Sequence, residues 1–243
     1  EPERVAPGTW LYEQHPEWLL TGRPKDDPQA GMRGWAARES GGSDPCVAFN
    51  PTDQVRTFAN IRWEPGQLSF HPGGKGEYSV VRWTAQQPGT YDVQAEFQAI
   101  DQSTTTDVHV LRGDKSLLSD KLQLDGRGKQ AAYQGKVEVA AGDTIDCVVG
   151  WGNGTHVCDS TGLVFRVTDA QGNTADAAKE FSADTAVTGP WSYGYLPPAS
   201  APDVAAFRVF DRKTEPGEAG TRLLSLGDPA AREWLTNHVD RLI

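Results

Sequence analysis

The sequence has little of three things: long apolar runs, positive charge and cysteine. No run approaches the roughly 18 consecutive apolar residues of a membrane-spanning helix, so we expect no membrane span. Only 23 Lys and Arg oppose 33 Asp and Glu. The resulting net charge of −10 repels a phosphate backbone and argues against nucleic acid as a partner. Hydrophobic residues make up 37%, but 8 Trp, 6 Tyr and 8 Phe are too many for a disordered chain. With 26 Gly and 16 Pro, the composition predicts a globular protein rich in turns.

The three cysteines are Cys46, Cys147 and Cys158, an odd number that cannot pair completely and forms no disulfide framework. Cys147 and Cys158 flank a loop rich in Gly and Asn. This leaves two alternatives open: a disulfide across a hairpin, or buried thiols that act as small hydrophobic side chains. His156 lies close to Cys158, but no Cys and His cluster has the spacing of a zinc site.

Strand patterns dominate from about Cys46 to Phe210. Alternating apolar and polar residues, bounded by Gly, Pro and Asp turns, recur at a spacing of roughly 10–15 residues. The predicted strands are 78–84, 91–97, 106–111, 133–139, 144–150, 162–167 and 207–210. Strands with one apolar and one polar face, and no helical period between them, predict a mainly β fold. We expect an antiparallel two-sheet β-sandwich of the jelly-roll kind.

The two ends of the chain differ in pattern from the centre. Residues 1–24 predict a short helical or irregular piece, and residues 25–45 predict a polar linker or long loop. Asp228 and Pro229 suit the start of a helix whose apolar face continues to Leu242. Because this helix reaches the last residue without a stop signal, we expect the chain to be a piece of a longer protein.

The centre resembles a β-sandwich module of bacterial secreted and surface proteins, which accompanies carbohydrate-active enzymes and looks like a carbohydrate-binding module. The resemblance covers residues 47–168. It rests on PGQLSFHPG, GEYSVVRWT, TTTDVHVL, AGDTID and DSTGL, which begin at Pro65, Gly76, Thr104, Ala141 and Asp159. In that family a Gly-Pro-Trp-Ser-Tyr-Gly-Tyr segment starts the sandwich, whereas here it follows as residues 189–195. The resemblance therefore implies a circularly permuted sandwich with neighbouring ends, which suits an insertion.

The flanks resemble glycoside hydrolase family 36, the α-galactosidase or melibiase type. The matching segments are 1–5, 12–20, 223–229 and 232–235. In that family a short loop separates the two halves of this match, whereas here most of the chain lies between them. The resemblance implies a (β/α)8 barrel with an insertion. Its parts would be a barrel stub over 1–30, a carbohydrate-binding-like sandwich over 31–212, and a second stub, with a strand and an amphipathic helix, over 213–243.

The catalytic residues of that family cannot be carried onto this chain. A glycosidase needs two carboxylates at the scissile bond, and in the resembled family both lie beyond Ile243. Glu1 and Glu3 match a pair at a strand end that could form a wall of the substrate pocket; the alternative is a loop carboxylate or a helix cap. Asp107 and His109 share one face of a strand, but no Ser lies in a nucleophile elbow. We expect this chain by itself to be non-catalytic.

Sugar binding requires flat aromatic rings that stack on pyranose C–H faces, together with a few polar groups for the hydroxyls. Trp151 lies in a Gly-rich loop with Asn153 and His156, which predicts a binding platform; the alternative is that it caps the end of the sandwich. Trp63 is a second candidate platform. The other aromatic residues of the strands are expected in the core: Trp83, Trp191, Tyr193 and Tyr195.

A structural calcium ion is common in carbohydrate-binding sandwiches, which bind it through carboxylate and carbonyl oxygens. Asp159 could supply a ligand, with Asp146 or Asp107 beside it. The spacing is not that of an EF-hand, and the alternative is a side chain that bonds the backbone of its own turn. No other cofactor is expected.

Three functions follow from these observations. The first is a non-catalytic carbohydrate-binding domain inserted in an α-galactosidase-type glycoside hydrolase, with oligo- or polysaccharides, galactosides among them, and the rest of the barrel as partners. The second is a wall of that hydrolase's active site, which controls substrate choice. The third is a structural or interaction sandwich without a ligand. The resemblances imply a secreted, periplasmic or cell-surface protein.

Overall fold

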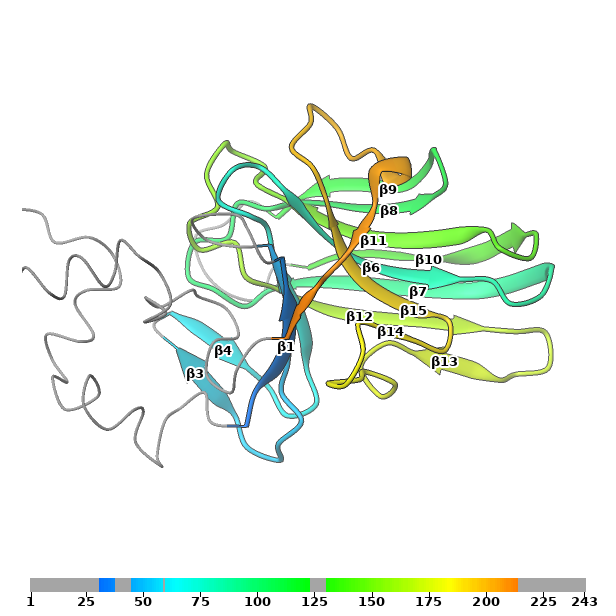
Figure 1. The fold of residues 1–243 in the computed structure, drawn as a ribbon, viewed down its shortest axis with the longest axis horizontal. Helices are drawn as coiled ribbons and strands as arrows, with labels where there is room; N and C mark the ends of the chain where they lie inside the picture. The colour runs from blue at the N-terminus through cyan, green and yellow to red at the C-terminus, as the bar shows by residue number, and fades with distance from the viewer. Residues whose placement is uncertain (1–30, 38–44, 59, 123–129, 214–243) are drawn as a thin grey trace, which may run out of the picture.

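A computed structural model describes residues 31–37, 45–58, 60–122 and 130–213, which form a sandwich of antiparallel strands (Figure 1). One sheet has the order β10 (Gln130–Val139), β7 (Gly89–Ala99), β12 (Thr161–Thr168), β5 (Leu68–His71), β2 (Cys46–Phe49), β1 (Arg33–Ala36) and β17 (Arg212–Lys213), with β13 (Thr174–Asp176) paired to β12. The other has the order β14 (Val187–Thr188), β15 (Trp191–Leu196), β6 (Tyr78–Thr84), β11 (Thr144–Gly150), β8 (Asp107–Arg112) and β9 (Lys115–Lys121), with β16 (Arg208–Val209) paired to β15. The mainly β, two-sheet fold class is confirmed.

Two smaller elements complete the described part of the chain. β3 (Arg56–Phe58) and β4 (Ile61–Trp63) form a hairpin outside the two large sheets. A single turn of 3-10 helix, η1 (Val204–Ala206), is the only helix among the described residues, and Asp203 caps it by accepting a hydrogen bond from the backbone N–H of Ala205. The helical flanks expected at 1–24 and after Asp228 lie outside the described residues.

The strand bounds follow the sequence closely where apolar and polar residues alternate. β6 and β11 have the predicted bounds, and β7, β8, β10 and β12 differ from theirs by one to three residues at an end. Residues 191–196 form β15, beside β6 in the second sheet. The expected loop over 25–45 is wrong for residues 33–36, which form β1, pair with β2 and bury Trp35. Its four residues are too short a run to show an alternating pattern.

The main core lies between the two sheets and is rich in aromatic rings. Phe70 and Phe97 stack at 6.0 Å between ring centroids, and Phe165 meets Trp191 edge to face at 5.1 Å. Trp83, Trp191 and Tyr193 belong to this core, as expected from their alternation. Tyr195 packs against it and stacks on Phe210. These contacts bury the large side chains that hold the sheets together.

The centre of the second sheet, β6 and β11, is largely buried on both faces, which the sequence did not predict. Every residue of β11 after Thr144 is buried, although the alternation predicted one polar face. The reason is the segment after β15, which folds over the outer face of the sheet. There Val204 and Phe207 pack on a small second core made of Tyr78, Val80, Leu111, Val148 and Leu196.

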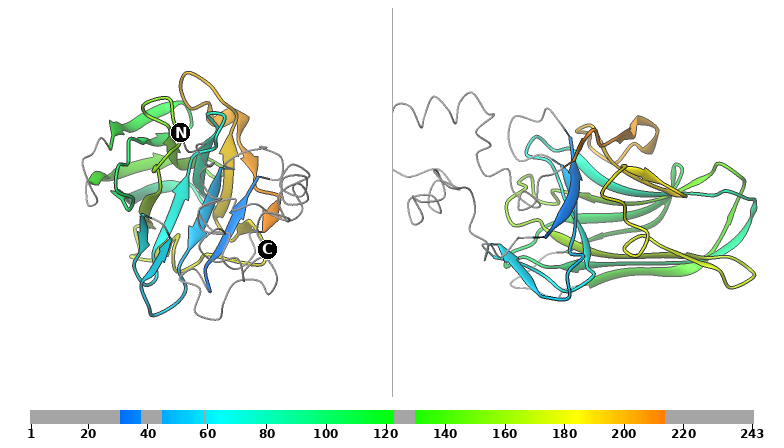
Figure 2. Two further views of the ribbon diagram at one scale, coloured as in Figure 1. Left: turned by 90° about the vertical axis from the view of Figure 1, so that its left-hand side faces the viewer. Right: turned by 60° about the horizontal axis from the view of Figure 1, so that its bottom comes forward.

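The described part of the chain begins and ends side by side. β1 pairs antiparallel with β17, in register from Trp35 with Lys213 to Ala36 with Arg212. The views in Figure 2 show the blue first strand and the orange last strand next to each other. A domain whose ends lie together can be inserted in another protein without separating the flanking segments.

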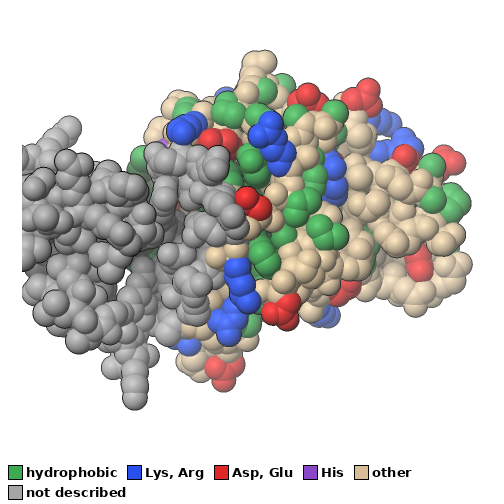
Figure 3. All heavy atoms as spheres, in the orientation of Figure 1, with side chains coloured by type: hydrophobic (Ala, Val, Ile, Leu, Met, Phe, Trp, Pro, Cys, Tyr) green, Lys and Arg blue, Asp and Glu red, His purple; other side chains and the backbone are tan. Residues whose placement is uncertain are grey.

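Figure 3 shows Lys and Arg interspersed with Asp and Glu over the visible described face. Among the described residues, the large hydrophobic side chains that stay exposed are three valines, Val157, Val187 and Val209, which offer little area for docking a protein.

All three cysteines are free thiols, so the disulfide alternative is wrong. No helix in the described ranges has the length and apolar character needed to cross a membrane.

Candidate functional site

A pocket of about 580 Å³ lies at one edge of the second sheet, where segments that precede or follow several of its strands meet. The β11–β12 loop contributes Trp151, Gly152 and Gly154 to its wall. The remaining wall comes from the residues before and at the start of β6, the ends of β8 and β9 that pair with each other, and the segment after β15: Lys75, Gly76, Tyr78, Asp107, Lys121, Pro198, Ala199 and Ser200. Segments far apart in the sequence therefore build one concave site around the first candidate platform.

Trp151 is half-buried and fixed in place. Its indole N–H donates a hydrogen bond to the carbonyl oxygen of Gly73, at 2.5 Å. A Cβ atom built on Gly76, whose φ is +94°, would lie 3.8 Å from the benzene part of the indole. A side chain there would make only an ordinary van der Waals contact with the ring, so the positive φ, and not a close approach, favours glycine at this position. Since its N–H is already paired, the ring is held in one orientation in the wall of the pocket.

An ionised carboxylate stands in the same wall. Asp107 Oδ2 lies 2.7 Å from His109 Nε2, and Asp107 Oδ1 accepts a hydrogen bond from the backbone N–H of Gly152 at 2.7 Å. Partial burial alone would raise the pKa of Asp107, but the hydrogen bonds from His109 and Gly152 together lower it below its ordinary value. The two-residue spacing on β8 places the carboxyl and the imidazole on one face, as expected. Asp107 therefore carries its charge at neutral pH.

Tyr78 supplies a second aromatic wall. Its hydroxyl donates to the carbonyl oxygen of Ala199 at 3.2 Å, which fixes the segment after β15 against β6. Burial, with a smaller contribution from the charge of Asp107, raises the pKa of Tyr78. The phenol is therefore neutral at physiological pH.

Two lysines add positive charge at the rim. Lys121 Nζ donates to the carbonyl oxygen of Gly152 at 3.0 Å, so the end of β9 holds the loop that carries Trp151. Lys75 also lines the pocket, and its backbone N–H donates to Glu77 at 2.9 Å. The site thus combines ring surface, one carboxylate and two ammonium groups.

The other residues predicted in this loop do not line the pocket. Asn153 is exposed, and its side-chain oxygen accepts from the backbone N–H of Thr155, which closes a turn. His156 packs near Trp151, with 6.4 Å between ring centroids, and meets His71 edge to face at 6.0 Å. Burial lowers the pKa of His156, and it lowers the pKa of His71 to about 4. These imidazoles are neutral at pH 7, and they support the loop from outside the pocket.

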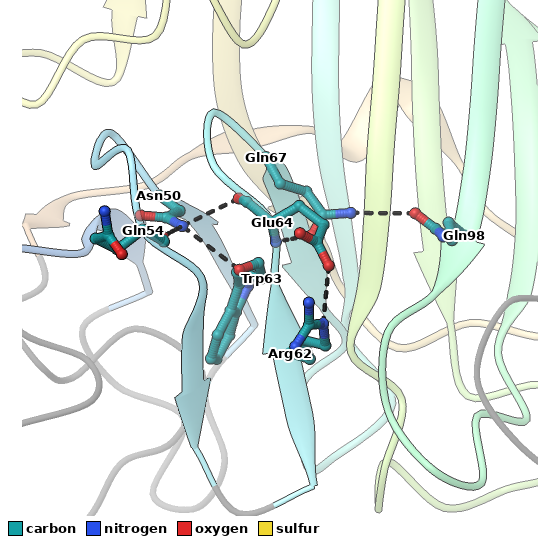
Figure 4. Close-up of polar contacts among 7 residues, drawn as sticks. All are labelled: Asn50, Gln54, Arg62, Trp63, Glu64, Gln67 and Gln98. Atoms are coloured by element: carbon teal, nitrogen blue, oxygen red, sulfur yellow. Dashed lines mark hydrogen bonds and ion pairs between the residues drawn. The ribbon is translucent and has the colours of Figure 1, made fainter.

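Trp63 is not a binding platform, because its ring is only 1% exposed. Its N–H donates to the Ser69 hydroxyl at 2.8 Å, under the β3–β4 hairpin. Around it, the buried amide of Asn50 donates to the carbonyl oxygens of Gln54 and Glu64, at 2.9 and 3.0 Å (Figure 4). Gln67 joins this network to the first sheet through Gln98. This corrects the sequence prediction: Trp63 packs in a small core with Met32, Ala48, Ile61 and Ile100.

Asp159, the predicted metal ligand, is fully buried. Its Oδ1 accepts from the backbone N–H of Thr105 at 2.9 Å and from the Thr105 hydroxyl at 3.1 Å. These donors belong to a distant segment, so the reading of Asp159 as a side chain bonded to its own turn is wrong. Asp146 is paired with Arg82, and Asp107 faces the pocket. Within the described ranges, no group of three or more His, Cys, Asp or Glu side chains could hold a metal ion.

The remaining predicted site residues, Glu1 and Glu3, lie outside the described residues. The pocket residues that the sequence analysis missed are chiefly Tyr78, Lys75 and Lys121. Tyr78 was assigned to a strand without a role, and nothing in the spacing of these residues connects them with Trp151. Only the pairing of β11 with β6 and β8, and of β8 with β9, brings them together.

Comparisons with known proteins give little support to any family. No family model matches the chain, and no curated protein matches it. Among solved structures, the chain is similar to a beta-glucosidase from Kluyveromyces marxianus in complex with glucose. The TM-score is 0.24 and the identity 14%, over 43% of this chain and 11% of the other. The match spans a small part of that enzyme, and at this TM-score it carries no argument about fold or function.

Proposed function

We propose that residues 31–212 are a non-catalytic carbohydrate-binding domain whose sugar site is the pocket beside Trp151. The observation that supports this most directly is that one concave site contains a fixed indole, a phenol and an ionised carboxylate. Aromatic rings bind the apolar faces of a pyranose, and a few fixed polar groups orient its hydroxyls. A volume of about 580 Å³ lies in the range of small-ligand sites and has room for a short saccharide.

The polar groups of the pocket are arranged in advance. A carboxylate has about four acceptor positions. Those of Asp107 are partly occupied by His109 and Gly152, which leaves acceptor capacity for a sugar hydroxyl. Lys75 and Lys121 can donate to other hydroxyl oxygens. Because the partners already fix Asp107 and Trp151, little side-chain freedom is lost when a ligand binds.

The same composition argues against hydrolysis in this pocket. Cleavage of a glycosidic bond uses two carboxyl groups, one on each side of the bond. Among the described residues that line the pocket, Asp107 is the one carboxylate. Its lowered pKa also makes it a poor proton donor at neutral pH. Binding without turnover is the function that fits these groups.

The domain's setting is part of the proposal. The pairing of β1 with β17 supports a module whose two ends leave at one place, as an insertion requires. We propose that the host is the α-galactosidase-type hydrolase that the flanking segments resemble. In that setting the domain would bind galactoside-containing polysaccharides next to the catalytic barrel and would be exported with it.

The direct test is isothermal titration calorimetry against galactose, melibiose and galactomannan. We expect saturable binding by the unaltered chain. Trp151→Ala should weaken it about tenfold or more, because loss of the stacking ring removes roughly 1.4 kcal/mol. Trp63→Phe is the matched control: it alters an indole that is buried away from the pocket, and it should leave the affinity unchanged. Circular dichroism should report the fold of each variant.

Two outcomes would contradict the proposal. If the unaltered chain bound none of a broad glycan panel, the domain would be a structural sandwich. If a folded Trp151→Ala variant bound as tightly as its parent, sugar binding would have to occur elsewhere on the domain. Circular dichroism separates either result from misfolding. The Trp63→Phe control shows in addition how loss of stability alone, with the pocket unchanged, affects binding.

The role of the carboxylate can be tested separately with Asp107→Asn. This change keeps the size of the side chain and one acceptor oxygen but removes the charge, so we expect affinity to fall several-fold. Since the pKa of Asp107 lies below its ordinary value, the unaltered chain should bind with constant affinity between pH 5 and pH 8. A steep loss of affinity between pH 7 and pH 5 would show that Asp107 is not the titrating group that matters.

A further inference from the structure

The pocket beside Trp151 has few free side-chain donors of hydrogen bonds other than ammonium groups. The indole N–H of Trp151 already donates to the carbonyl oxygen of Gly73, and the Tyr78 hydroxyl donates to that of Ala199. Both aromatic residues therefore offer a ligand mainly their ring surface. Among the described lining residues, the side-chain donors that remain are the exposed hydroxyl of Ser200 and the ammonium groups of Lys75 and Lys121.

Neither ammonium group forms an ion pair with a carboxylate within the described ranges. Lys121 Nζ donates to the carbonyl oxygen of Gly152 at 3.0 Å, which is a neutral acceptor. Glu77 is the acid closest in sequence to Lys75, but the contact between them is made by the backbone N–H of Lys75, which donates to Glu77 Oε2 at 2.9 Å. An ammonium group has three N–H donors and no acceptor. Most of the donor capacity of the two lysines is therefore open to a ligand.

The two lysines come from different parts of the pocket wall. Lys121 lies directly opposite Asp107 in the pairing of β9 with β8, so their side chains share one face of the sheet. Lys75 comes from the segment before β6, beside the indole: a Cβ atom on the next residue, Gly76, would lie 3.8 Å from the ring of Trp151. Lys121 is thus the lysine that faces the carboxylate of the pocket. The charge of Lys75 is left without a counterpart among the described lining residues.

The charge of the pocket is opposite in sign to that of the chain. The described lining residues carry two ammonium groups and one carboxylate, whereas the chain has a net charge of −10. A concave site lined mainly by charge of one sign focuses the electric field and raises the local concentration of ligands with the opposite charge. A neutral sugar would use the ring of Trp151 and the carboxylate of Asp107, but it would gain nothing from this field. An anionic sugar would use all three.

We propose that the ligand of this pocket is an acidic sugar, a pyranoside that carries a carboxylate or a sulfate ester; the inference rests on the sugar-binding function proposed above. The anionic substituent binds the ammonium group of Lys75, and the pyranose ring stacks on Trp151. Asp107 and Lys121 then bind the hydroxyls. A carboxylate only accepts hydrogen bonds, so it matches the donors that the lysines leave open. Lysine acts as a point charge and, unlike arginine, does not select a planar anion, so the carboxylate and the sulfate share this chemistry.

The experiment compares sugars that differ only in the substituent at C6, by isothermal titration calorimetry of the unaltered chain. The sugars are galactose, galacturonic acid, galactose 6-sulfate and, as a neutral control, the methyl ester of galacturonic acid. At low salt we expect at least one of the two acids to bind roughly fivefold more tightly than galactose, and the methyl ester to bind as galactose does. In 1 M NaCl, where the Debye length is about 3 Å, the preference for the acid should disappear. The comparison of the two acids shows which anion the pocket prefers.

Two lysine variants locate the preference. Lys75→Met keeps the aliphatic stem and removes the ammonium group, so the ratio of the affinities for the acid and for galactose should fall to near one. Lys115→Met is the matched control, because Lys115 is an exposed lysine of β9 that does not line the pocket. It changes the net charge of the chain by the same amount and should leave the ratio unchanged.

Binding of galactose with no tighter binding of either acid would overturn this inference and leave the proposed sugar-binding function intact. Failure of all four sugars to bind would overturn it as well, and the neutral glycans of the earlier titration would still decide the proposed function. A preference for the acid that persisted in folded Lys75→Met, or that fell equally in Lys115→Met, would overturn the assignment of the anionic group to Lys75.

Discussion

Replacing Gly152 by Ala should lower the free energy of unfolding by about 4 kcal/mol or more. Losses of this size are exceptional for a single substitution, and here we expect one because the backbone must move. A Cβ atom at Gly152 would lie 1.9 Å from the carbonyl oxygen of Thr105 and 2.8 Å from the backbone N of Asp107. Both are backbone atoms of the segment that leads into β8, and they cannot turn aside as a side chain can. The loop must therefore leave its place on β8, which breaks the bond from Gly152 N–H to Asp107.

Gly154→Ala is the matched control, because it lies in the same loop and also has a positive φ. Its φ is +87°, and a Cβ atom there would have no heavy atom within 4 Å. Only the cost of the left-handed backbone conformation should then lower the free energy of unfolding, by about 1–2 kcal/mol. Denaturation by urea measures both variants. Similar losses of stability in Gly152→Ala and Gly154→Ala would show that the backbone around Gly152 moves easily to admit a side chain. That result would also argue against a pocket whose shape is fixed before a ligand binds.

The sequence predicted the sandwich well because alternation reports directly on burial. β6 and β11 were found with their bounds, since long β-branched runs end at clear turns. β1 was missed because a four-residue strand that contains Gly34 has no readable period. The burial of β11 on both faces was missed for a different reason: the segment that covers it comes from residues after β15, and no local pattern reports on a distant cover.

The candidate site was predicted only at its centre. Trp151 stands out as a large ring among glycines, where core packing does not require one. Asn153 and His156 are its neighbours in sequence, but the turn at Asn153 uses its side chain locally and His156 packs behind the ring. Tyr78 and Lys121 join Trp151 through strand pairing, which composition and spacing cannot reveal. Trp63 shows the converse case: an apparently isolated indole proved to be covered by its own hairpin.

The second large effect is expected at Arg82, which pairs with Asp146 on the covered outer face of the second sheet. Arg82→Met should lower the free energy of unfolding by about 3–5 kcal/mol at pH 7, because it leaves a buried carboxylate without its partner. The two residues face each other across β6 and β11, and Arg82 Nε lies 2.6 Å from Asp146 Oδ1. The guanidinium also donates to the carbonyl oxygen of Val204 and lies over the ring of Phe207. Thermal or urea unfolding measures the loss.

The dependence of that loss on pH identifies its cause. Burial raises the pKa of Asp146 even in the native pair, where hydrogen bonds and the charge of Arg82 oppose the shift. Without Arg82 the pKa must rise further. A carboxyl group whose folded-state pKa is raised costs nothing while it is protonated in both states, and it destabilises the fold as pH rises above the unfolded value of about 3.9. The deficit of Arg82→Met should therefore be largest at pH 7 and shrink toward pH 4.

A double variant separates the charge from the packing. Arg82→Met combined with Asp146→Asn removes the unpaired charge, so its loss of stability at pH 7 should be smaller than that of Arg82→Met alone, and nearly independent of pH. What remains would be the lost bond to Val204 and the lost contact with Phe207, the two interactions by which Arg82 holds the segment after β15 on the sheet. That segment also forms one wall of the pocket through Pro198 and Ala199. If the deficit of the single variant were constant between pH 4 and pH 7, the stability at this place would come from the covering segment and not from the ion pair.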